Sequence, residues 1–309
     1  MAILSGFVYF YKYTSTRIIT PDSPTDYVWT PGKALNTMEE GFAWLKIDKN
    51  GYNNVHEKAN GEQVDILLMG SSHMLGTEVP ADANTGYLLN ELLPYRTYNI
   101  GMTGHYLSTC INNLPFALDR FHPDKYVIIQ TQMVSPTLKE MEEVLLGTYG
   151  EVESDSGRLI KLLQTYVPAS KKLMIQVEAW RQTEKTSKEK IDSQTEEYQD
   201  VLRKYLSLAK GYTADYDTKL VILYTGPTKI DEAGNMIPVD EDVEGFSNAC
   251  RDCGILFVDM TEDFKRQYES EHILTHGFIN TAIGAGHLNK YGHALIAERL
   301  AQVIKEDEQ

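Results

Sequence analysis

The stretch VDILLMGSSHMLG, from Val64 to Gly76, begins with a nearly continuous run of apolar residues and ends on small polar ones. Apolar runs of this length are typical of strands that are buried on both faces, as in parallel sheets. The run leads directly into Gly70-Ser71-Ser72-His73. Two interpretations are open here: serines that cap a following helix, or a serine nucleophile held at the end of a strand.

Four further apolar runs follow, and segments with helical periodicity separate them. We expect strands at 64–70, 96–102, 126–133, 219–227 and 255–260, and helices at 85–93, 106–121, 195–212, 243–254 and 292–306. This alternation predicts an α/β fold with a doubly wound, five-stranded parallel sheet and helices on both faces. Ligands of such sheets bind beyond the carboxyl ends of the strands.

Residues 1–63 differ from the rest in being rich in Pro, Asp, Asn, Thr and Tyr, with one helix-like patch at 34–46. They predict an N-terminal extension on a domain at 64–309, in which about 137–195 form a polar helical insertion. The apolar run at 2–11 is shorter than the roughly 20 residues that span a bilayer. Either it docks on the core, or it is the remnant of a membrane anchor with an aromatic flank.

The charge of the chain narrows the classes of partner. Its formal net charge is −15, which argues against a nucleic-acid surface and against an anionic membrane surface. Neutral, carbohydrate-like or small acyl substrates remain open. No phosphate loop or HExxH motif occurs, so we expect neither a cofactor nor a metal. Cys250 and Cys253 form a CxxC, but a helix-like segment carries it before a strand, the reverse of the redox arrangement.

Residues that follow the expected strands and precede the last expected helix supply the parts of a serine site. A serine hydroxyl needs a base in hydrogen-bond reach and donors for the oxyanion. Ser72 or Ser71 is the candidate nucleophile, and His287, in GHLNKYGH, is the candidate base. The backbone N–H groups of Ser72 and Gly104 are candidate donors, and His73 has a supporting role. Helix-capping serines and a loop histidine bonded to a carbonyl are the structural alternatives.

These blocks, in this order, resemble the SGNH, or GDSL-like, hydrolase superfamily. The family's Gly-Asp-Ser block corresponds to Gly70-Ser71-Ser72, which places the nucleophile on Ser72 with Ser71 in place of the aspartate. YNIGMTGH puts Gly104 in the oxyanion-hole role, and GHLNKYGH puts His287 in the role of the base. The Gly-Ser-Ser-His form is similar to that of secreted or membrane-anchored bacterial relatives that modify cell-surface polymers.

Two positions depart from the family pattern. The family has an aspartate three residues before its histidine, and Gly284 stands there in this chain. A backbone carbonyl, Asp259 or Asp263 is expected to take its place, unless a Ser-His dyad suffices. The family also has an oxyanion-hole asparagine after the third strand, where this chain has Thr131-Gln132. The amide of Gln132 is the expected substitute.

The resemblance implies a flavodoxin-like SGNH hydrolase fold and a serine esterase or O-acyltransferase of the deacetylase type. The substrate would be an O-acyl group on a carbohydrate or cell-envelope polymer, or a small ester, with an acyl-Ser72 intermediate. Asn280, in the segment THGFIN, is a candidate substrate-binding residue. The implied location is extracytoplasmic, with membrane anchoring through the N-terminus. The alternatives are a catalytically impaired carbohydrate-binding protein and a thioester-handling enzyme, and the oligomeric state stays open.

Overall fold

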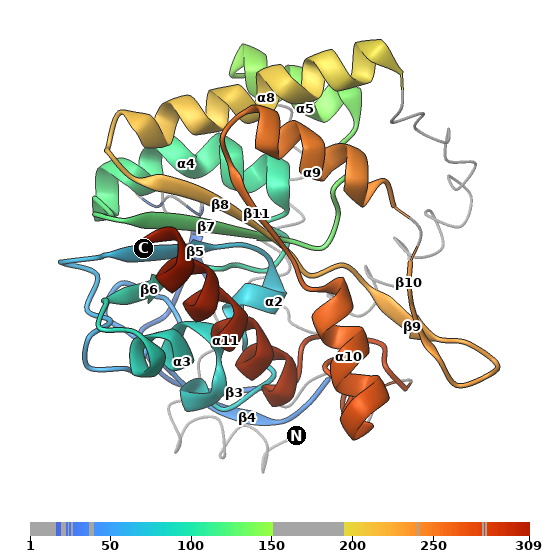
Figure 1. Ribbon diagram of the computed structural model, residues 1–309. Helices are drawn as coiled ribbons and strands as arrows, with labels where there is room; N and C mark the ends of the chain where they lie inside the picture. The colour runs from blue at the N-terminus through green and yellow to red at the C-terminus, as the bar shows by residue number, and fades with distance from the viewer. Residues whose placement is uncertain are drawn as a thin grey trace, which may run out of the picture.

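A five-stranded parallel sheet forms the centre of the molecule (Figure 1). The computed structural model describes residues 17–19, 23, 25, 27–36, 40–150, 195–239, 241–279, 281 and 283–309. The strands of the sheet are β5 (Ile66–Met69), β6 (Thr97–Asn99), β7 (Tyr126–Thr131), β8 (Lys219–Tyr224) and β11 (Leu256–Asp259). The expectation of a doubly wound parallel sheet is confirmed.

The order of the strands locates the ligand edge. They lie in the order β11-β8-β7-β5-β6, and every neighbouring pair is parallel. From β5 the chain first moves outward to β6 and then returns across β5 to β7. The topological switch point, where such folds bind ligands, therefore lies between β5 and β7, directly above Gly70-Ser71-Ser72-His73.

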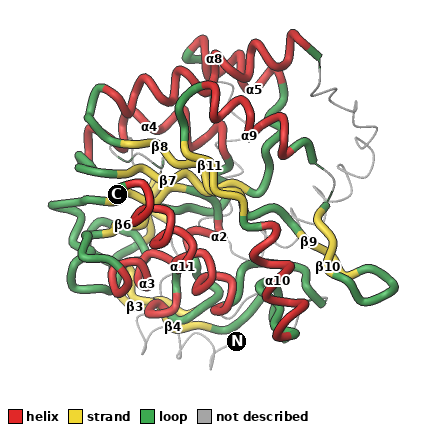
Figure 2. Tube along the Cα trace, viewed as in Figure 1, coloured by secondary structure: helices red, strands yellow, loops and turns green. Residues whose placement is uncertain are grey.

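Helices cover both faces of the sheet (Figures 1 and 2). One layer contains α4 (Leu107–Phe121), α5 (Leu138–Leu146), α8 (Glu196–Ala214) and α9 (Val243–Asp252). The other contains α2 (Ser72–Leu75), α3 (Thr85–Leu92), α10 (Thr261–Glu271) and α11 (Lys290–Asp307), with a 3₁₀ turn η1 (Ala81–Ala83). Strand β5 serves both cores: Leu67 and Met69 pack under the first layer, Ile66 and Leu68 under the second.

The described part of the N-terminal region consists of antiparallel strand pairs. Strands β1 (Arg17–Ile19) and β2 (Tyr27–Trp29) form one pair, and β3 (Gly32–Asn36) and β4 (Ala43–Ile47) form the other. The predicted helix at 34–46 is wrong. In β4 burial alternates with a period of two residues, and Gly41 before it has φ +64°, which interrupts a helix.

Several predictions fall partly or wholly outside the described residues. The apolar run at 2–11 lies outside them, as do residues 151–194 of the expected polar insertion. The described beginning of that insertion is α5, which starts with a capping box made by Thr137 and Glu140. The strand pair β9 (Thr228–Ile230) and β10 (Met236–Pro238) was not expected. Within the described ranges, no helix combines the length and the apolar character needed to cross a membrane.

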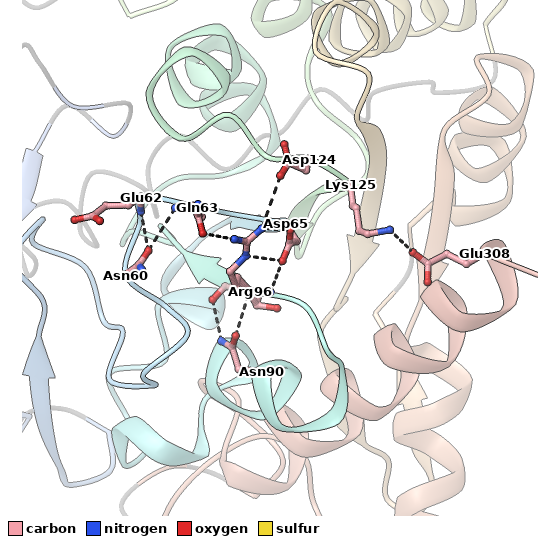
Figure 3. Close-up of polar contacts among 10 residues, drawn as sticks. Asn60, Glu62, Gln63, Asp65, Asn90, Arg96, Asp124, Lys125 and Glu308 are labelled. Atoms are coloured by element: carbon pink, nitrogen blue, oxygen red, sulfur yellow. Dashed lines mark hydrogen bonds and ion pairs between the residues drawn. The ribbon is translucent and has the colours of Figure 1, made fainter.

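Ion pairs fasten the edge of the sheet that lies opposite the switch point (Figure 3). Asp65 precedes β5 and Arg96 precedes β6, and the Arg96 guanidinium donates to both carboxylate oxygens of Asp65, at 2.9 and 2.6 Å. The backbone N–H of Arg96 donates to the same carboxylate at 2.7 Å. Lys125, before β7, pairs at 3.0 Å with Glu308, which follows α11. These contacts hold three neighbouring strands and the last helix in register.

Candidate active site

The turn after β5 is shaped by Gly70 and Ser71. Gly70 has φ +150°, and a β-carbon there would lie 2.7 Å from Gln130 Oε1. The Ser71 hydroxyl donates to that oxygen at 3.0 Å and accepts the N–H of His73 at 3.3 Å as the N-cap of α2. Ser71 is fully buried, so its hydroxyl is committed to the turn. The helix-capping interpretation therefore applies to the first serine.

Ser72, the first residue of α2, faces the loop that precedes α11. Its Oγ lies 2.8 Å from Nε2 of His287, and both side chains are partly exposed. A neutral imidazole accepts the serine proton at this distance, which is the geometry required of a general base. The structure thus brings together two side chains that lie 215 residues apart in the sequence.

The loop that carries His287 is fixed by backbone contacts. Gly277 N–H donates to the His287 carbonyl at 2.9 Å, and His276 and Leu288 form an isolated antiparallel bridge. Asn289 caps α11 by accepting the N–H groups of the first turn. These bonds place the imidazole at the amino end of α11, directly over α2.

The other nitrogen of His287 faces Glu40, which lies just before β4. Glu40 Oε2 is 2.9 Å from His287 Nδ1 and accepts the backbone N–H of His287 at 2.6 Å. The distance between Nδ1 and the carboxylate is that of an ion pair. The carboxylate oxygen does not lie in line with the N–H bond, so the contact does not meet the geometry of a hydrogen bond. The two side chains are 27% and 23% exposed, so the contact is partly shielded from water.

The expected acids do not reach His287. Asp259, at the end of β11, accepts the N–H of Thr261, the first residue of α10, at 2.8 Å. Asp263 lies on α10, 3.5 Å from Arg266 and 3.7 Å from Arg299. Each carboxylate has a local partner on α10 or α11. The structure places Glu40, which sequence reasoning missed, where one of them was expected.

Two backbone donors near Ser72 are unpaired among the described residues: the N–H groups of Ser72 itself and of Gly104. Gly104 has φ +83°, and a β-carbon there would meet no atom within 4 Å, so this turn is open. The loop lies close to the end of β5 because Met102 N–H donates to Gly70 O at 2.9 Å. These are the donors that the sequence proposed for the oxyanion.

Gln132 is turned toward His73. Its amide nitrogen lies 2.6 Å from His73 Nε2, so the neutral ring of His73 carries its proton on Nδ1. The ring of His73 lies 5.0 Å from that of His287. His73 is therefore a neighbour of the base, and Gln132 holds its ring in place. One N–H of the Gln132 amide is used in this contact.

Three buried histidines surround His287 without carrying charge at neutral pH. Burial, with a smaller contribution from neighbouring histidines, lowers the pKa of His276 to about 4 and that of His293 to about 3. Burial also holds the pKa of His73 well below its usual range. An imidazolium formed on His287 during a reaction would thus face neutral rings and the Glu40 carboxylate.

A shallow groove of about 300 Å³ lies beside the site. It is lined by Glu78 and by the aromatic side chains of Phe42, Phe278 and Tyr291, among others. Phe42 is 63% exposed and Tyr291 46% exposed, so the groove presents apolar rings to solvent. Asn280, the expected substrate-binding residue, lies outside the described residues.

Neither a family model nor a curated protein matches this sequence. Solved structures do resemble it. The fold assignment, a doubly wound five-stranded parallel sheet, comes from the topology of this chain.

Three of these structures illustrate the likeness. One is LAE5, an alpha/beta hydrolase from the metagenome of Lake Arreo, with 15% identity, 78% of this chain and 94% of that chain covered, and a TM-score of 0.41. Another is the acetyl xylan esterase AlAXEase, with 14% identity, 77% and 98% covered, and a TM-score of 0.41. The third is a carbohydrate esterase family 2 enzyme with its carbohydrate binding domain from Corynascus thermopiles, with 14% identity, 82% and 69% covered, and a TM-score of 0.39. At these values the fold and the residue roles rest on the topology and geometry of this chain itself.

Proposed function

We propose that this protein is a serine esterase or O-acyltransferase that works through an acyl-Ser72 intermediate. The observation that carries the proposal is the 2.8 Å contact between Ser72 Oγ and His287 Nε2 at the switch point of the sheet. A serine used only as a helix cap would have its hydroxyl turned to the backbone, as Ser71 does. Ser72 is instead paired with a base and partly open to solvent.

The proposed reaction has two halves. In the first, Ser72 Oγ attacks the ester carbonyl while His287 Nε2 takes the hydroxyl proton, and the N–H groups of Ser72 and Gly104 stabilise the oxyanion. The C–O bond to the leaving alcohol then breaks, and His287 returns the proton to that alcohol. In the second half, water or an acceptor hydroxyl loses its proton to His287 and attacks acyl-Ser72. The carboxylic acid or the new ester departs, and the proton returns to Ser72.

An O-acyl group, such as acetyl, on a carbohydrate or cell-envelope polymer is the proposed substrate. Exposed aromatic rings in the groove, including Phe42 and Tyr291, suit the apolar faces of sugars. The net charge of −15 disfavours strongly anionic polymers. An extracytoplasmic location, with anchoring through the N-terminal region, is part of the same proposal.

The alternative is a carbohydrate-binding protein that has lost its activity. Gly284 and the missing asparagine after β7 are its support in the sequence. The distance between Ser72 and His287 favours catalysis over binding, since a binding protein needs no base within hydrogen-bond reach of a serine.

The test is covalent labelling followed by ester cleavage. The wild-type protein is expected to react with a fluorophosphonate at Ser72 and to release acetate from p-nitrophenyl acetate or acetylated xylan. Ser72→Ala should abolish both, whereas Ser270→Ala, at an exposed serine of α10, should change neither. Adding a sugar acceptor separates transfer from hydrolysis by the appearance of a new ester. A wild-type protein inert to the label and to every ester would contradict the proposal.

A further inference from the structure

We propose that Glu40, supplied by the N-terminal region, is the positioning residue of His287, so that this region completes the active site. The inference rests on the proposed function and deepens it. Glu40 would do the work of the acid that is missing at Gly284: it would fix the imidazole orientation and stabilise the imidazolium.

The contact has the geometry of an orienting group. One oxygen, Glu40 Oε2, lies 2.9 Å from Nδ1 of His287 and accepts the backbone N–H of the same residue at 2.6 Å. A carboxylate at Nδ1 favours the tautomer with its proton on Nδ1. The lone pair of Nε2 then faces Ser72, 2.8 Å away, as a base requires. The contact at Nδ1 is an ion-pair contact and not an aligned hydrogen bond, and a positive charge developing on the ring would strengthen it.

Two glycines make room for Glu40. A β-carbon on Gly286 would lie 2.5 Å from Glu40 Oε2, and Gly286 has φ +105°, which favours glycine. On the other side, a β-carbon on Gly41 would lie 2.7 Å from the carbonyl oxygen of Glu78, and Gly41 has φ +64°. The chain is thus free of side chains immediately beside the carboxylate and immediately before the histidine, where the two segments approach most closely.

Glu78 is the rival acid. Burial raises the pKa of its carboxyl, and the carboxyl interacts electrostatically with His287 and Glu40. The Thr77 hydroxyl donates to it at 3.0 Å. Within the described part of the chain, its carboxylate forms neither a hydrogen bond nor an ion pair with His287. Glu40 is therefore the acid in contact with the base.

The N-terminal region is anchored well enough to hold a functional group. In β4, Ala43, Leu45 and Ile47 are buried. After β4, Asn53 donates to the carbonyl of Leu75 at 2.9 Å, at the end of α2. Asn54 pairs with the backbone of Asn99, at the end of β6, through two hydrogen bonds of 2.9 and 3.0 Å. Glu40 is thus tied to the strands and the helix that also carry the nucleophile and the oxyanion loop.

The experiment compares Glu40→Gln with wild type in the full chain, with Glu62→Gln as control. Glu62 lies in the same N-terminal region and pairs with Lys49 on the surface. We expect Glu40→Gln to lower kcat for ester cleavage about 10²- to 10⁴-fold with little change in KM, because the tautomer of the base is lost. Glu40→Asp keeps the charge at a longer distance and should lose less. The control should match wild type.

A second measurement does not depend on turnover. In ¹⁵N-histidine NMR spectra, His287 of the folded wild type should show the tautomer protonated on Nδ1, and Glu40→Gln should shift it toward the Nε2 form. Full activity and an unchanged tautomer in Glu40→Gln would overturn the inference. If Ser72→Ala is inactive while Glu40→Gln is fully active, only this inference fails. If every variant and the wild type are inert but the tautomer shifts, the proposed function fails and the positioning role stands.

Discussion

Ser71 and Gln130 form a closed pair under the site: the serine hydroxyl and its backbone N–H both point to Gln130 Oε1, at 3.0 and 3.1 Å. Gln130 in turn donates to the Thr225 hydroxyl at 2.7 Å, which links β5, β7 and the end of β8. The hydroxyl of Ser71 therefore stabilises the turn, whereas the hydroxyl of the neighbouring Ser72 contacts His287.

Replacing each of the two serines by alanine, one at a time, should separate the structural role from the catalytic role. Ser71→Ala removes a buried cap and a buried hydrogen bond, so it should lower the free energy of unfolding by about 1–2 kcal/mol while the protein still takes up a fluorophosphonate. Ser72→Ala should leave stability nearly unchanged and abolish labelling. Urea unfolding and mass spectrometry of the labelled protein measure the two effects. Labelling on Ser71 in Ser72→Ala, or loss of labelling in a folded Ser71→Ala, would reverse the assignment.

Gly286→Ala should mimic the loss of Glu40. Its methyl group would lie 2.5 Å from Glu40 Oε2 and would push the carboxylate away from His287. We expect a fall in kcat/KM close to that of Glu40→Gln, and little additional loss when the two changes are combined. Gly234→Ala is the matched control, since Gly234 also has a positive φ (+87°) but no atom within 4 Å of a β-carbon. Fully additive losses in the double variant would contradict a shared mechanism.

An aspartate at position 284 should restore part of the activity that Glu40→Gln removes. Gly284 has φ +70°, a conformation that aspartate tolerates better than most residues, and a β-carbon there would be in ordinary contact, 3.4 Å from Ile230. In the Glu40→Gln background, Gly284→Asp should raise kcat at least about tenfold, whereas Gly284→Asn should not. The ratio of kcat between these two double variants is the measurement. Equal activities would show that no carboxylate acts on His287 from that loop.

The Asp65–Arg96 pair should make stability depend on pH at the edge far from the site. Hydrogen bonds from Arg96 hold the pKa of the Asp65 carboxyl below its usual value of 3.8, although burial opposes this. The pair therefore stabilises the fold above about pH 4 and loses its effect as the pH falls through the lower folded-state value. Asp65→Asn should cost about 1–2 kcal/mol at pH 7, since Arg96 is a third exposed and partly screened, and distinctly less near pH 3.

Urea unfolding at the two pH values tests this prediction. Glu62→Gln, which removes an exposed ion pair with Lys49, serves as the control and should change stability little at either pH. An Asp65→Asn penalty that is equal at pH 7 and pH 3 would mean that the carboxylate charge contributes nothing to the fold.

The central sheet could be predicted from the sequence because its signals are local. Each strand is an apolar run a few residues long, and parallel strands end at a common edge, so Ser72 and His287 could be assigned to one site before their distance was known. The turn after β5 was more ambiguous. Only the contact with Gln130 distinguishes Ser71 from Ser72, and it crosses 59 residues of sequence.

Glu40 could not be found in this way. Its contact with His287 spans 247 residues, and the hydrophobic periodicity of a sequence does not indicate which distant side chains meet. The surrounding segment also contains strong helix formers, Ala34, Met38, Glu39 and Leu45 among them, which led to the wrong helix. The alternation in β4 was the one available signal, together with the glycine that precedes it. The contact between Gln132 and His73 could not be found either, since it crosses 59 residues of sequence.

The separation of Glu40, Ser72 and His287 along the chain also has a consequence during protein synthesis. Ser72 leaves the ribosome 215 residues ahead of His287, and Glu40 leaves 247 residues ahead. A nascent chain therefore carries the hydroxyl and the carboxylate long before the imidazole that joins them. Translation intermediates, and chains that end before the loop carrying His287, should therefore not cleave esters, even where their central sheet has formed.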